Sequence, residues 1–272
     1  MSKKLLIIGK KNSSKTVFIT QFYIRLQKGK SKLSLYETVS DLSAISAAKD
    51  ALVNGDEPEP TFAGSNISVL LPIKFNEQQI DLYYPDFGGE QINRIITTRE
   101  VDKNWTEAIR ESDNWVFFIR LNSINRQLDI SNTKVTEHHT HGKNIDVPYS
   151  TTEQSSLIEL LQIFLHSKGS DYHLKNSKVK LTVALTCWDE LNTSEKPRTV
   201  LEEQLPLLLN FIESNWMADK VNFIGLSALQ FPLTKPENKA RYENEGSENF
   251  GYLIKADGQK TNDITELIAE AI

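Results

Sequence analysis

The residues best suited to chemistry form a polar loop between two apolar segments near the N-terminus. The apolar run Leu5–Ile8 predicts a buried strand, and the loop after it reads G-x-x-x-x-S-K-T from Gly9 to Thr16. This order differs at one position from G-x-x-x-x-G-K-[ST], whose backbone N–H groups surround the phosphates of a nucleotide. In that pattern the lysine neutralises phosphate charge and the hydroxyl binds Mg²⁺. The loop therefore predicts a phosphate site made of Gly9, Asn12, Ser13, Ser14, Lys15 and Thr16.

Ser14 is the departure from this pattern, because it occupies the position of a glycine. Glycine there lets the backbone approach a phosphate without a Cβ, and serine adds a small side chain. The loop leads into an expected helix over Lys15–Gln27, whose positive N-terminal end would face the phosphates. A strand, a basic loop and a helix can also meet by chance, so further residues must decide between the two interpretations.

A second strand end carries residues that suit the phosphate side of a nucleotide site. The strand Gln79–Tyr84 leads into Pro85-Asp86-Phe87-Gly88-Gly89-Glu90, which contains D-x-x-G. A carboxylate at Asp86 can hold Mg²⁺ through water, and the N–H of Gly89 can meet a γ-phosphate.

Two later strand ends suit the base of a nucleotide. The strand Val179–Leu185 ends in Thr186-Cys187-Trp188-Asp189, and the carboxylate of Asp189 can accept two N–H bonds from a guanine edge. Adenine lacks that pair of donors. The strand Val221–Leu226 ends in Ser227-Ala228, where a backbone N–H can meet the guanine carbonyl oxygen.

With these four motifs in order, the chain resembles the translation-factor-like and Ras-like (TRAFAC) GTPase superfamily from Leu5 to about Leu229. Residues 85–90 and 251–263 resemble, more narrowly, the bacterial double-GTPase type domains, which are often encoded in multi-gene conflict or defence loci. The resemblance implies an α/β, Ras-like P-loop fold with a mostly parallel sheet, one antiparallel edge strand and helices on both faces. It also implies GTP or GDP as ligand, Mg²⁺ as cofactor and a protein partner or effector.

The resemblance implies catalytic roles as well. Lys15 and Mg²⁺ would neutralise charge, with Thr16 and Asp86 holding the metal. Thr61 is the expected switch-loop threonine that senses Mg²⁺ and γ-phosphate, with Thr38 as the fallback. Glu90 stands where Ras-like proteins have a water-orienting glutamine, and a carboxylate there can still accept a hydrogen bond from water.

Three readings of the function remain open from the residues: a switch that hydrolyses GTP, a non-catalytic pseudo-GTPase and an ATP-using P-loop enzyme. Cys187 replaces the lysine of the superfamily's N/T-K-x-D motif, and together with Ser14 and Glu90 it also fits a non-catalytic pseudo-GTPase. An ATP-using P-loop enzyme is a third reading, against which the motif Thr186–Asp189 speaks. Arg94 or Arg99 can also supply an arginine to the γ-phosphate, although such residues more often lie on a solvated helix face.

Composition limits the class of protein. The chain has 272 residues with 39% hydrophobic and 25% charged side chains, so we expect one domain over residues 1–272. Residues 122–150 are polar and patternless and predict an insertion or mobile loop, and residues 236–272 a C-terminal extension that packs on the domain. The net charge of −5 argues against a nucleic-acid binder. A cytoplasmic location is expected, because Cys187 is the only cysteine and no apolar run of transmembrane or signal-peptide type is present.

The remaining pattern predicts the elements that position these motifs. The spacing of core residues is found at Trp105, Trp115, Phe117 and Phe118. A separate cluster, His138-His139-x-His141, is interpreted as a solvated loop rather than a metal site. Further strands are expected over Ser68–Phe75 and Trp115–Leu121. Helices are expected over Leu42–Val53 after Asp41, over Arg99–Glu111, from a capping box Thr151–Gln154 through His166, over Pro197–Trp216 with a kink or split at Pro206, and from Asp263 to Ile272.

Overall fold

The computed structural model describes residues 2–59, 66–87, 90–124, 152–171 and 173–272. Thr61, Gly89, Thr151, the histidine cluster and nearly all of the predicted insertion therefore lie outside the described residues. The elements run β1 (Lys3–Gly9), α1 (Lys15–Gln27), β2 (Leu33–Leu35), α2 (Ser43–Val53), β3 (Asn66–Phe75), β4 (Gln78–Phe87), α3 (Glu90–Thr98), α4 (Lys103–Glu111), β5 (Asn114–Arg120), α5 (Glu153–Lys168), β6 (Lys180–Thr186), α6 (Pro197–Gln204), α7 (Pro206–Asn215), β7 (Val221–Ser227), α8 (Pro236–Glu245), β8 (Tyr252–Ile254), β9 (Lys260–Thr261) and α9 (Glu266–Ala271).

One mixed sheet forms the centre of the molecule, with the strand order β2-β3-β4-β1-β5-β6-β7-β8-β9. Strands β4, β1, β5, β6 and β7 are mutually parallel, which confirms the predicted α/β class. The antiparallel pairing extends further than predicted. It covers β2, β3 and β4 at one edge and the β8–β9 hairpin beside β7 at the other. The C-terminal residues thus complete the far edge of the sheet.

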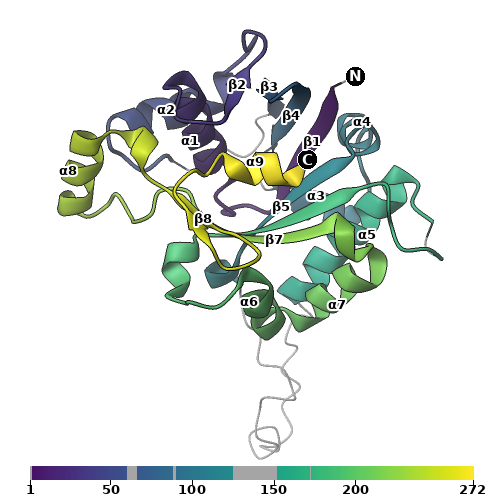
Figure 1. Cartoon of the computed structure of the whole chain (residues 1–272). Helices are drawn as coiled ribbons and strands as arrows, with labels where there is room; N and C mark the ends of the chain where they lie inside the picture. Colours follow the sequence, from purple (N-terminus) through teal and green to yellow (C-terminus); the bar gives the residue numbers. More distant parts are fainter. Residues whose placement is uncertain (1, 60–65, 88–89, 125–151, 172) are drawn as a thin grey trace, which may run out of the picture.

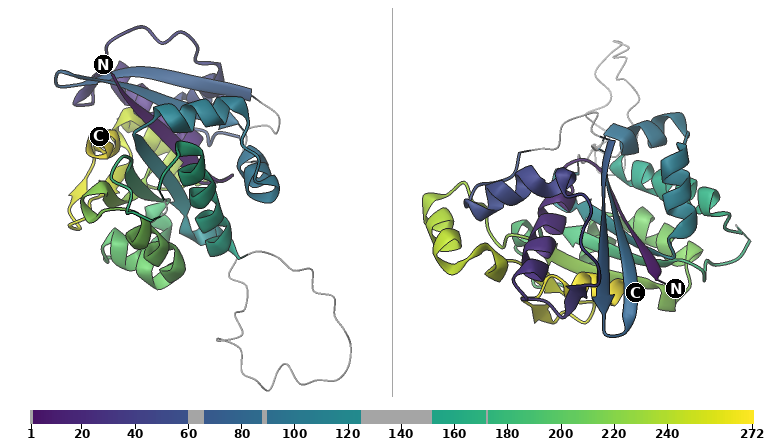
Figure 2. Two further views of the ribbon diagram at one scale, coloured as in Figure 1. Left: turned by 90° about the vertical axis from the view of Figure 1, so that its right-hand side faces the viewer. Right: turned by 90° about the horizontal axis from the view of Figure 1, so that it is seen from above.

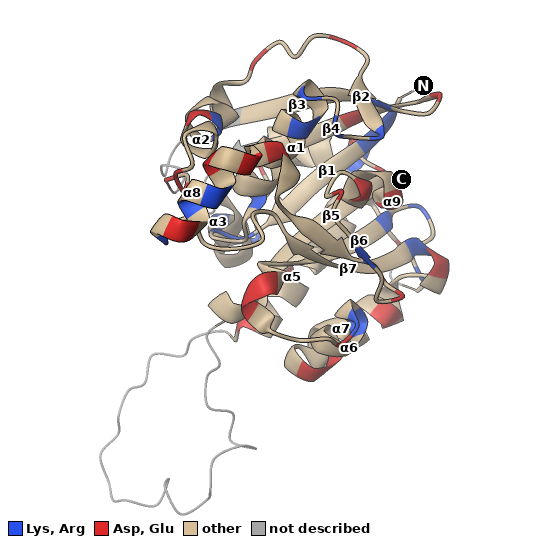
Figure 3. Cartoon of the chain, turned by 60° about the vertical axis from the view of Figure 1, so that its left-hand side comes forward, with Lys and Arg blue, Asp and Glu red and all other residues tan. Residues whose placement is uncertain are grey.

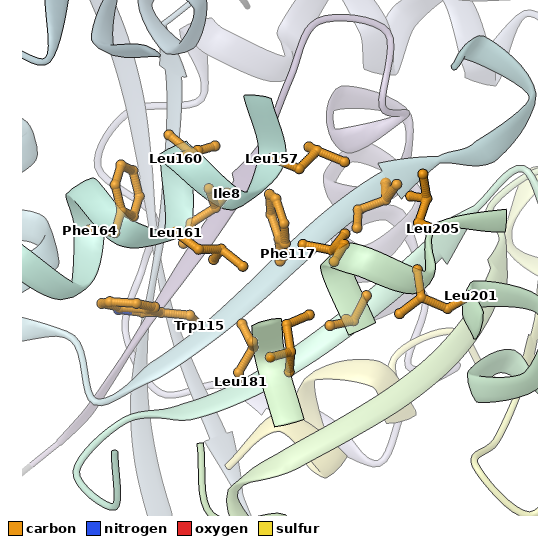
Figure 4. Close-up of a cluster of buried hydrophobic side chains, with 14 of the residues drawn as sticks. Ile8, Trp115, Phe117, Leu157, Leu160, Leu161, Phe164, Leu181, Leu201 and Leu205 are labelled. Carbon is orange, nitrogen blue, oxygen red and sulfur yellow. The ribbon is translucent and has the colours of Figure 1, made fainter. Parts of the chain in front are cut away.

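Alternation along the central strands divides the core into two layers. On β1, Leu6 and Ile8 face one cluster of buried side chains while Leu5 and Ile7 face the other, as expected for the two-residue period of a strand. The first cluster gathers side chains from β1, β5 and β6 and from helices α5 and α6, which pack against them (Figure 4). Because both faces are covered, these strands have apolar side chains on both sides rather than on one side alone.

Helices cover both faces of the sheet, as predicted (Figures 1 and 2). The cluster containing Leu5 packs against α1, α2 and α9, and the cluster containing Leu6 packs against α3 to α7. The four aromatic residues assigned to the core, Trp105, Trp115, Phe117 and Phe118, are each at most 2% exposed. That prediction is confirmed.

The predicted helix Arg99–Glu111 is wrong at its start. Arg99 has a positive φ of 59° and α4 begins at Lys103, because the Asp102 side chain accepts a hydrogen bond from the Trp105 N–H at 2.9 Å and caps the helix. Helix α3 before it was not predicted. Its apolar residues Ile92 and Ile95 are buried, but they are too few to mark a helix by their spacing alone.

The expected capping box at the start of α5 is also corrected. Thr152 is the N-cap, and its hydroxyl accepts from the Ser155 N–H at 3.2 Å. Gln154 instead reaches the neighbouring helix, where its Oε1 accepts from the Leu207 N–H at 2.9 Å at the start of α7. That second helix end exists because Pro206 splits the long predicted helix into α6 and α7, as the sequence indicated.

A buried arginine joins α1 to the C-terminal segment. The Arg25 guanidinium is 3% exposed and donates to the carbonyls of Phe250 and Asn262, both at 2.6 Å. Asp263 lies 3.7 Å from it and supplies the opposite charge. Asp263 also accepts from the Thr265 N–H before α9, close to its predicted capping role. These contacts attach α1 to the C-terminal segment, which helps to hold the loop at the N-terminus of α1.

Candidate nucleotide-binding site

The motifs singled out in the sequence meet at one edge of the sheet. Strands β1, β5, β6 and β7 are parallel neighbours, so their carboxyl ends, at Gly9, Arg120, Thr186 and Ser227, point the same way. In open α/β sheets this edge is where ligands bind. The loop after β1 lies at the start of α1 and faces the loops that follow β6 and β7.

The side chain of Lys15 lies across the phosphate loop. Its Nζ donates to the carbonyls of Gly9 at 2.7 Å and Lys10 at 2.8 Å and to Ser13 Oγ at 3.2 Å. Ser13 Oγ in turn donates to the Lys10 carbonyl at 2.7 Å. These bonds direct the loop's carbonyls toward the ammonium group and away from the space in front of the α1 N-terminus. The loop is thus ordered by hydrogen bonds from its own lysine and serine side chains.

Gly9 is required by the close approach of two strands. A Cβ at this position would lie 2.7 Å from Ser13 Oγ and 2.9 Å from the Phe118 carbonyl, well inside contact distance. Any side chain would therefore push β1 away from β5 or open the loop. This is a steric requirement on the glycine, independent of its place in the motif.

Ser14 adopts the conformation that explains why glycine is preferred there. Its φ is 62° and its ψ is 16°, the left-handed region, which costs a residue with a Cβ about 1–2 kcal/mol. Its side chain makes no capping hydrogen bond to α1. The departure noted in the sequence is therefore a strained backbone position in an otherwise ordered loop.

Ser14→Gly is expected to raise the free energy of unfolding by about 0.5–1 kcal/mol. Relief of the left-handed strain exceeds the roughly 0.5–1 kcal/mol of extra unfolded-state entropy that glycine brings. Urea denaturation measures the change, and the affinity for GTP should be kept or improved. Ser14→Ala is the control, because it keeps the Cβ and should give no gain. A loss of stability on Ser14→Gly would contradict the assigned strain.

The Thr16 hydroxyl, which the motif assigns to Mg²⁺, has a buried partner. Its Oγ1 lies 2.8 Å from the hydroxyl of Tyr84, a fully buried residue on β4. Tyr84 packs in the α1-side cluster, whereas the next residue back, Tyr83, packs on the other side of the sheet. A rigid hydroxyl beside a metal ligand fixes the ligand's orientation. A hydroxyl held in this way at a helix N-terminus fits the oxygen chemistry that Mg²⁺ prefers.

Tyr84→Phe is expected to weaken Mg²⁺ binding to the nucleotide complex about tenfold or more, the usual effect of removing an outer partner of a metal ligand. The measurement is release of a fluorescent GDP analogue at a series of Mg²⁺ concentrations. The release rate in excess chelator should not change, because Tyr84 acts on the metal ligand alone. Tyr83→Phe is the matched control. An unchanged Mg²⁺ dependence in Tyr84→Phe would remove this tyrosine from the site.

The base side of the candidate site is built around Asp189. Ser227 Oγ donates to Asp189 Oδ1 at 2.5 Å and accepts from the Gln230 N–H at 2.9 Å. The serine therefore fixes the carboxylate through one oxygen. Thr186, at the end of β6, is 1% exposed, and its hydroxyl has no hydrogen-bond partner among the described residues.

A cleft of about 340 Å³ opens beside Asp189. It joins the end of the phosphate loop to the base motif and to the loop after β7. Its walls are Ser14, Val17, Glu57, Pro58, Arg120, Cys187, Asp189, Glu190, Ala228, Leu229, Phe231, Pro232 and Thr234. The structure thus brings together Ser14, Asp189 and Ala228, three residues that the sequence assigned to one nucleotide.

The loop after α2 closes one side of this cleft. The Leu233 N–H donates to Glu57 Oε1 at 2.9 Å, and Lys239 on α8 pairs with Asp56 at 2.5 Å. Along α8 the basic residues Lys239 and Arg241 lie between acidic ones (Figure 3). The residues immediately before the predicted switch threonine are therefore attached to the loop that carries Ala228.

Other residues singled out in the sequence lie away from this cleft or have no described side chain. Asp86 and Glu90 occupy the end of β4 and the first position of α3, and nothing is described of their side chains. Arg99 pairs with Glu159 on α5 at 2.6 Å, and Arg94 lines a separate cavity beside Trp105. Trp188 is 4% exposed and packs against Gly225, where a Cβ would lie 2.5 Å from the indole. It belongs to the core rather than to the cleft.

Three residues of the site were missed in the sequence. Arg120 ends an otherwise apolar strand, and a lone charge at that position was a usable signal. Tyr84 reads as one more core aromatic, and Glu57 as one more loop acid, so neither carries a signal of its own.

A family model described as Double-GTPase 1 matches residues 6–271. The chain belongs to this family. The Double-GTPase 1 match confirms the resemblance drawn from the four motifs, including its narrower part, and the chain carries a GTPase-like domain. A search of curated proteins finds no match. Within the described residues, no helix is both long and apolar enough to cross a membrane.

Solved GTPase structures resemble this Double-GTPase 1 chain at low sequence identity. The GTP-bound GTPase-like domain of Ski7 from S. cerevisiae is 16% identical, with a TM-score of 0.44, over 84% of this chain and 43% of that one. Arl6 BBS3, a small GTPase from Trypanosoma brucei with a bound nucleotide analogue, is 12% identical, with a TM-score of 0.42, over 91% and 98%. The chain spans less than half of the Ski7 structure it matches.

Proposed function

We propose that this chain is a GTP-binding switch that hydrolyses GTP slowly with Mg²⁺. The observation that carries the proposal is that two features of a nucleotide site lie at the same edge of the sheet. One is a phosphate loop ordered by Lys15, and the other is a cleft lined by a fixed carboxylate at Asp189. Membership of the Double-GTPase 1 family supports the same reading.

At the phosphate end, Lys15 would exchange its bonds to the loop carbonyls for bonds to β- and γ-phosphate oxygens. Backbone N–H groups from Gly9 to Thr16 would supply the remaining contacts. Thr16, with Asp86 through water, would hold Mg²⁺, and Gly89 and Thr61 would contact the γ-phosphate. Bound Mg²⁺ supplies neutralisation of the charge that develops between the β- and γ-phosphates.

At the base end, Asp189 Oδ2 and the second lone pair of Oδ1, which already accepts from Ser227, would accept two N–H groups of guanine. The N–H of Ala228 would donate to the guanine carbonyl oxygen. Loss of the γ-phosphate on hydrolysis would release the segments that carry Thr61 and Gly89, which is the switch.

Glu90→Ala is expected to slow single-turnover GTP hydrolysis about tenfold or more, equivalent to roughly 1.4 kcal/mol of barrier. In the proposal Glu90 orients the attacking water, and positioning carries most of the catalysis in phosphoryl transfer. Affinity for GTP should change little. Glu90→Gln restores the superfamily's residue and should retain turnover. Equal rates in wild type and Glu90→Ala would remove this residue from the mechanism.

The resemblance to domains of bacterial conflict and defence loci extends the proposal to the cellular setting. We infer a cytoplasmic protein that acts with a partner or effector encoded nearby. The partner is proposed as a protein, because the net charge of −5 does not suit a polyanion.

A pseudo-GTPase is the second candidate, favoured by the strained Ser14 and by Cys187 in place of a lysine. Nucleotide extraction from the purified protein separates the two. Bound GDP or GTP together with measurable turnover supports the switch. Bound nucleotide without turnover indicates a pseudo-GTPase or an obligate activating partner, and an empty protein that binds no added GTP overturns the proposal.

A further inference from the structure

An arginine occupies the wall of the cleft where the base motif lacks its lysine. Arg120 ends β5, and in the parallel register its Cα lies opposite that of Thr186, the residue before Cys187. Its side chain lines the same cleft as Ser14, Asp189 and Ala228. A cation from a neighbouring strand thus lines the cleft in which the T-x-x-D motif supplies no positive charge.

Glu190 holds this guanidinium in a fixed plane. Arg120 Nε donates to Glu190 Oε2 at 3.1 Å, and its Nη2 donates to Oε1 of the same carboxylate. The Asn122 amide donates to the Glu190 carbonyl at 3.2 Å and fixes the acid in turn. A two-point Arg–carboxylate pair sets the plane of the guanidinium as well as its position. Both side chains are about one-third exposed, so the pair faces the cleft rather than the core.

Cys187 is compatible with this arginine in a way that lysine is not. Burial raises the pKa of the Cys187 thiol to about 11 despite the nearby Arg120, so the side chain is neutral. Ser14 of the phosphate loop lines the same cleft as this thiol and acts to lower its pKa. A lysine at this position would place a second positive charge beside Arg120, and like charges in a partly buried site repel.

We propose that Arg120 takes the place of the missing lysine and covers one face of the guanine base, with Glu190 as its positioning residue. The inference rests on the proposed function. A planar, weakly hydrated guanidinium stacks on an aromatic ring more readily than an ammonium does. In this proposal the flexible lysine side chain of the base motif is replaced by the Arg120 guanidinium, which Glu190 holds in a fixed orientation on the adjacent strand.

The test is the affinity of four proteins for GDP, measured by titration calorimetry: wild type, Arg120→Ala, Cys187→Lys and the double variant. Inorganic tripolyphosphate is the second ligand, because it reports the phosphate loop without a base. Arg120→Ala should weaken GDP binding about tenfold, in the range of a stacked cation, and leave tripolyphosphate unchanged. Cys187→Lys alone should give no gain, and in the Arg120→Ala background it should restore most of the loss.

Arg198→Ala is the control, since it removes another exposed arginine paired with carboxylates, on α6 away from the cleft. If Arg120→Ala unfolds at a lower temperature than wild type, Arg120→Gln is used in its place. The glutamine keeps a bond to Glu190 but removes the planar cation, and it should show the same loss of GDP affinity. Unchanged GDP affinity in these variants, an equal loss for tripolyphosphate, or no rescue by Cys187→Lys would overturn the inference alone. A wild type that binds no guanine nucleotide would overturn the proposed function as well.

Discussion

Lys15→Ala is expected to lower the affinity for GTP by about 100-fold or more. A hydrogen bond to a charged group contributes roughly 1.5–3 kcal/mol, and Lys15 would make such bonds to two phosphates. The structure adds a second cause, because Lys15 Nζ holds the carbonyls of Gly9 and Lys10. Without the ammonium group these carbonyls lose their donor, so the loop is less well ordered before the ligand binds.

The measurement is equilibrium binding of a fluorescent GTP analogue, with thermal melting to establish that the variant is folded. Lys11→Ala is the matched control, because Lys11 is an exposed lysine of the same loop. It should bind GTP within a few-fold of wild type. A dissociation constant for Lys15→Ala equal to that of wild type would refute the phosphate-loop reading.

Asp189→Asn should change the preferred base from guanine to xanthine. The carboxylate accepts two N–H groups of guanine in the proposal, and an amide presents only one acceptor oxygen. Two charge-assisted bonds at roughly 1.5–3 kcal/mol each predict a loss of GTP affinity of about 100-fold or more. Xanthine carries a carbonyl in place of the amino group, so xanthosine triphosphate should gain affinity for the variant.

Competition of GTP and xanthosine triphosphate for wild type and Asp189→Asn measures this exchange. Ser227→Ala should give a smaller loss, because the carboxylate remains but loses the hydroxyl at 2.5 Å that orients it. Asp219→Asn, in the short helix before β7, is the charge-matched control. GTP affinity that survives Asp189→Asn would place the base elsewhere.

The sheet and most helices could be predicted because their signals are local. The buried strands are continuous apolar runs. A proline inside a helical pattern interrupts the helix, and α7 begins at Pro206. The N-termini of α4 and α5 were harder to predict, because several residues able to cap a helix lie within a few positions of one another. Thr152 rather than Thr151 caps α5, and Gln154 is drawn to the N-terminus of α7, a contact that only the tertiary fold creates.

The candidate site divides in the same way. Lys15, Thr16 and Asp189 belong to short motifs whose spacing is fixed by a strand and a turn, so they were found from the sequence. Arg120 and Tyr84 act from neighbouring strands, and only the register of β5 with β6 and the packing of β4 against α1 bring them to the site. The antiparallel β8–β9 edge was missed for the related reason that its strands are only two or three residues long.

The choice of nucleotide by the unmodified chain tests the proposed GTP-binding site most directly. The measurement is competition of unlabelled GTP, GDP and ATP against a fluorescent guanine nucleotide, at fixed Mg²⁺ and with the wild-type protein. We expect GTP and GDP to compete at concentrations at least about 100-fold below ATP, because only guanine supplies the two donors that Asp189 accepts. Equal competition by ATP, or no binding of either triphosphate, would contradict the account.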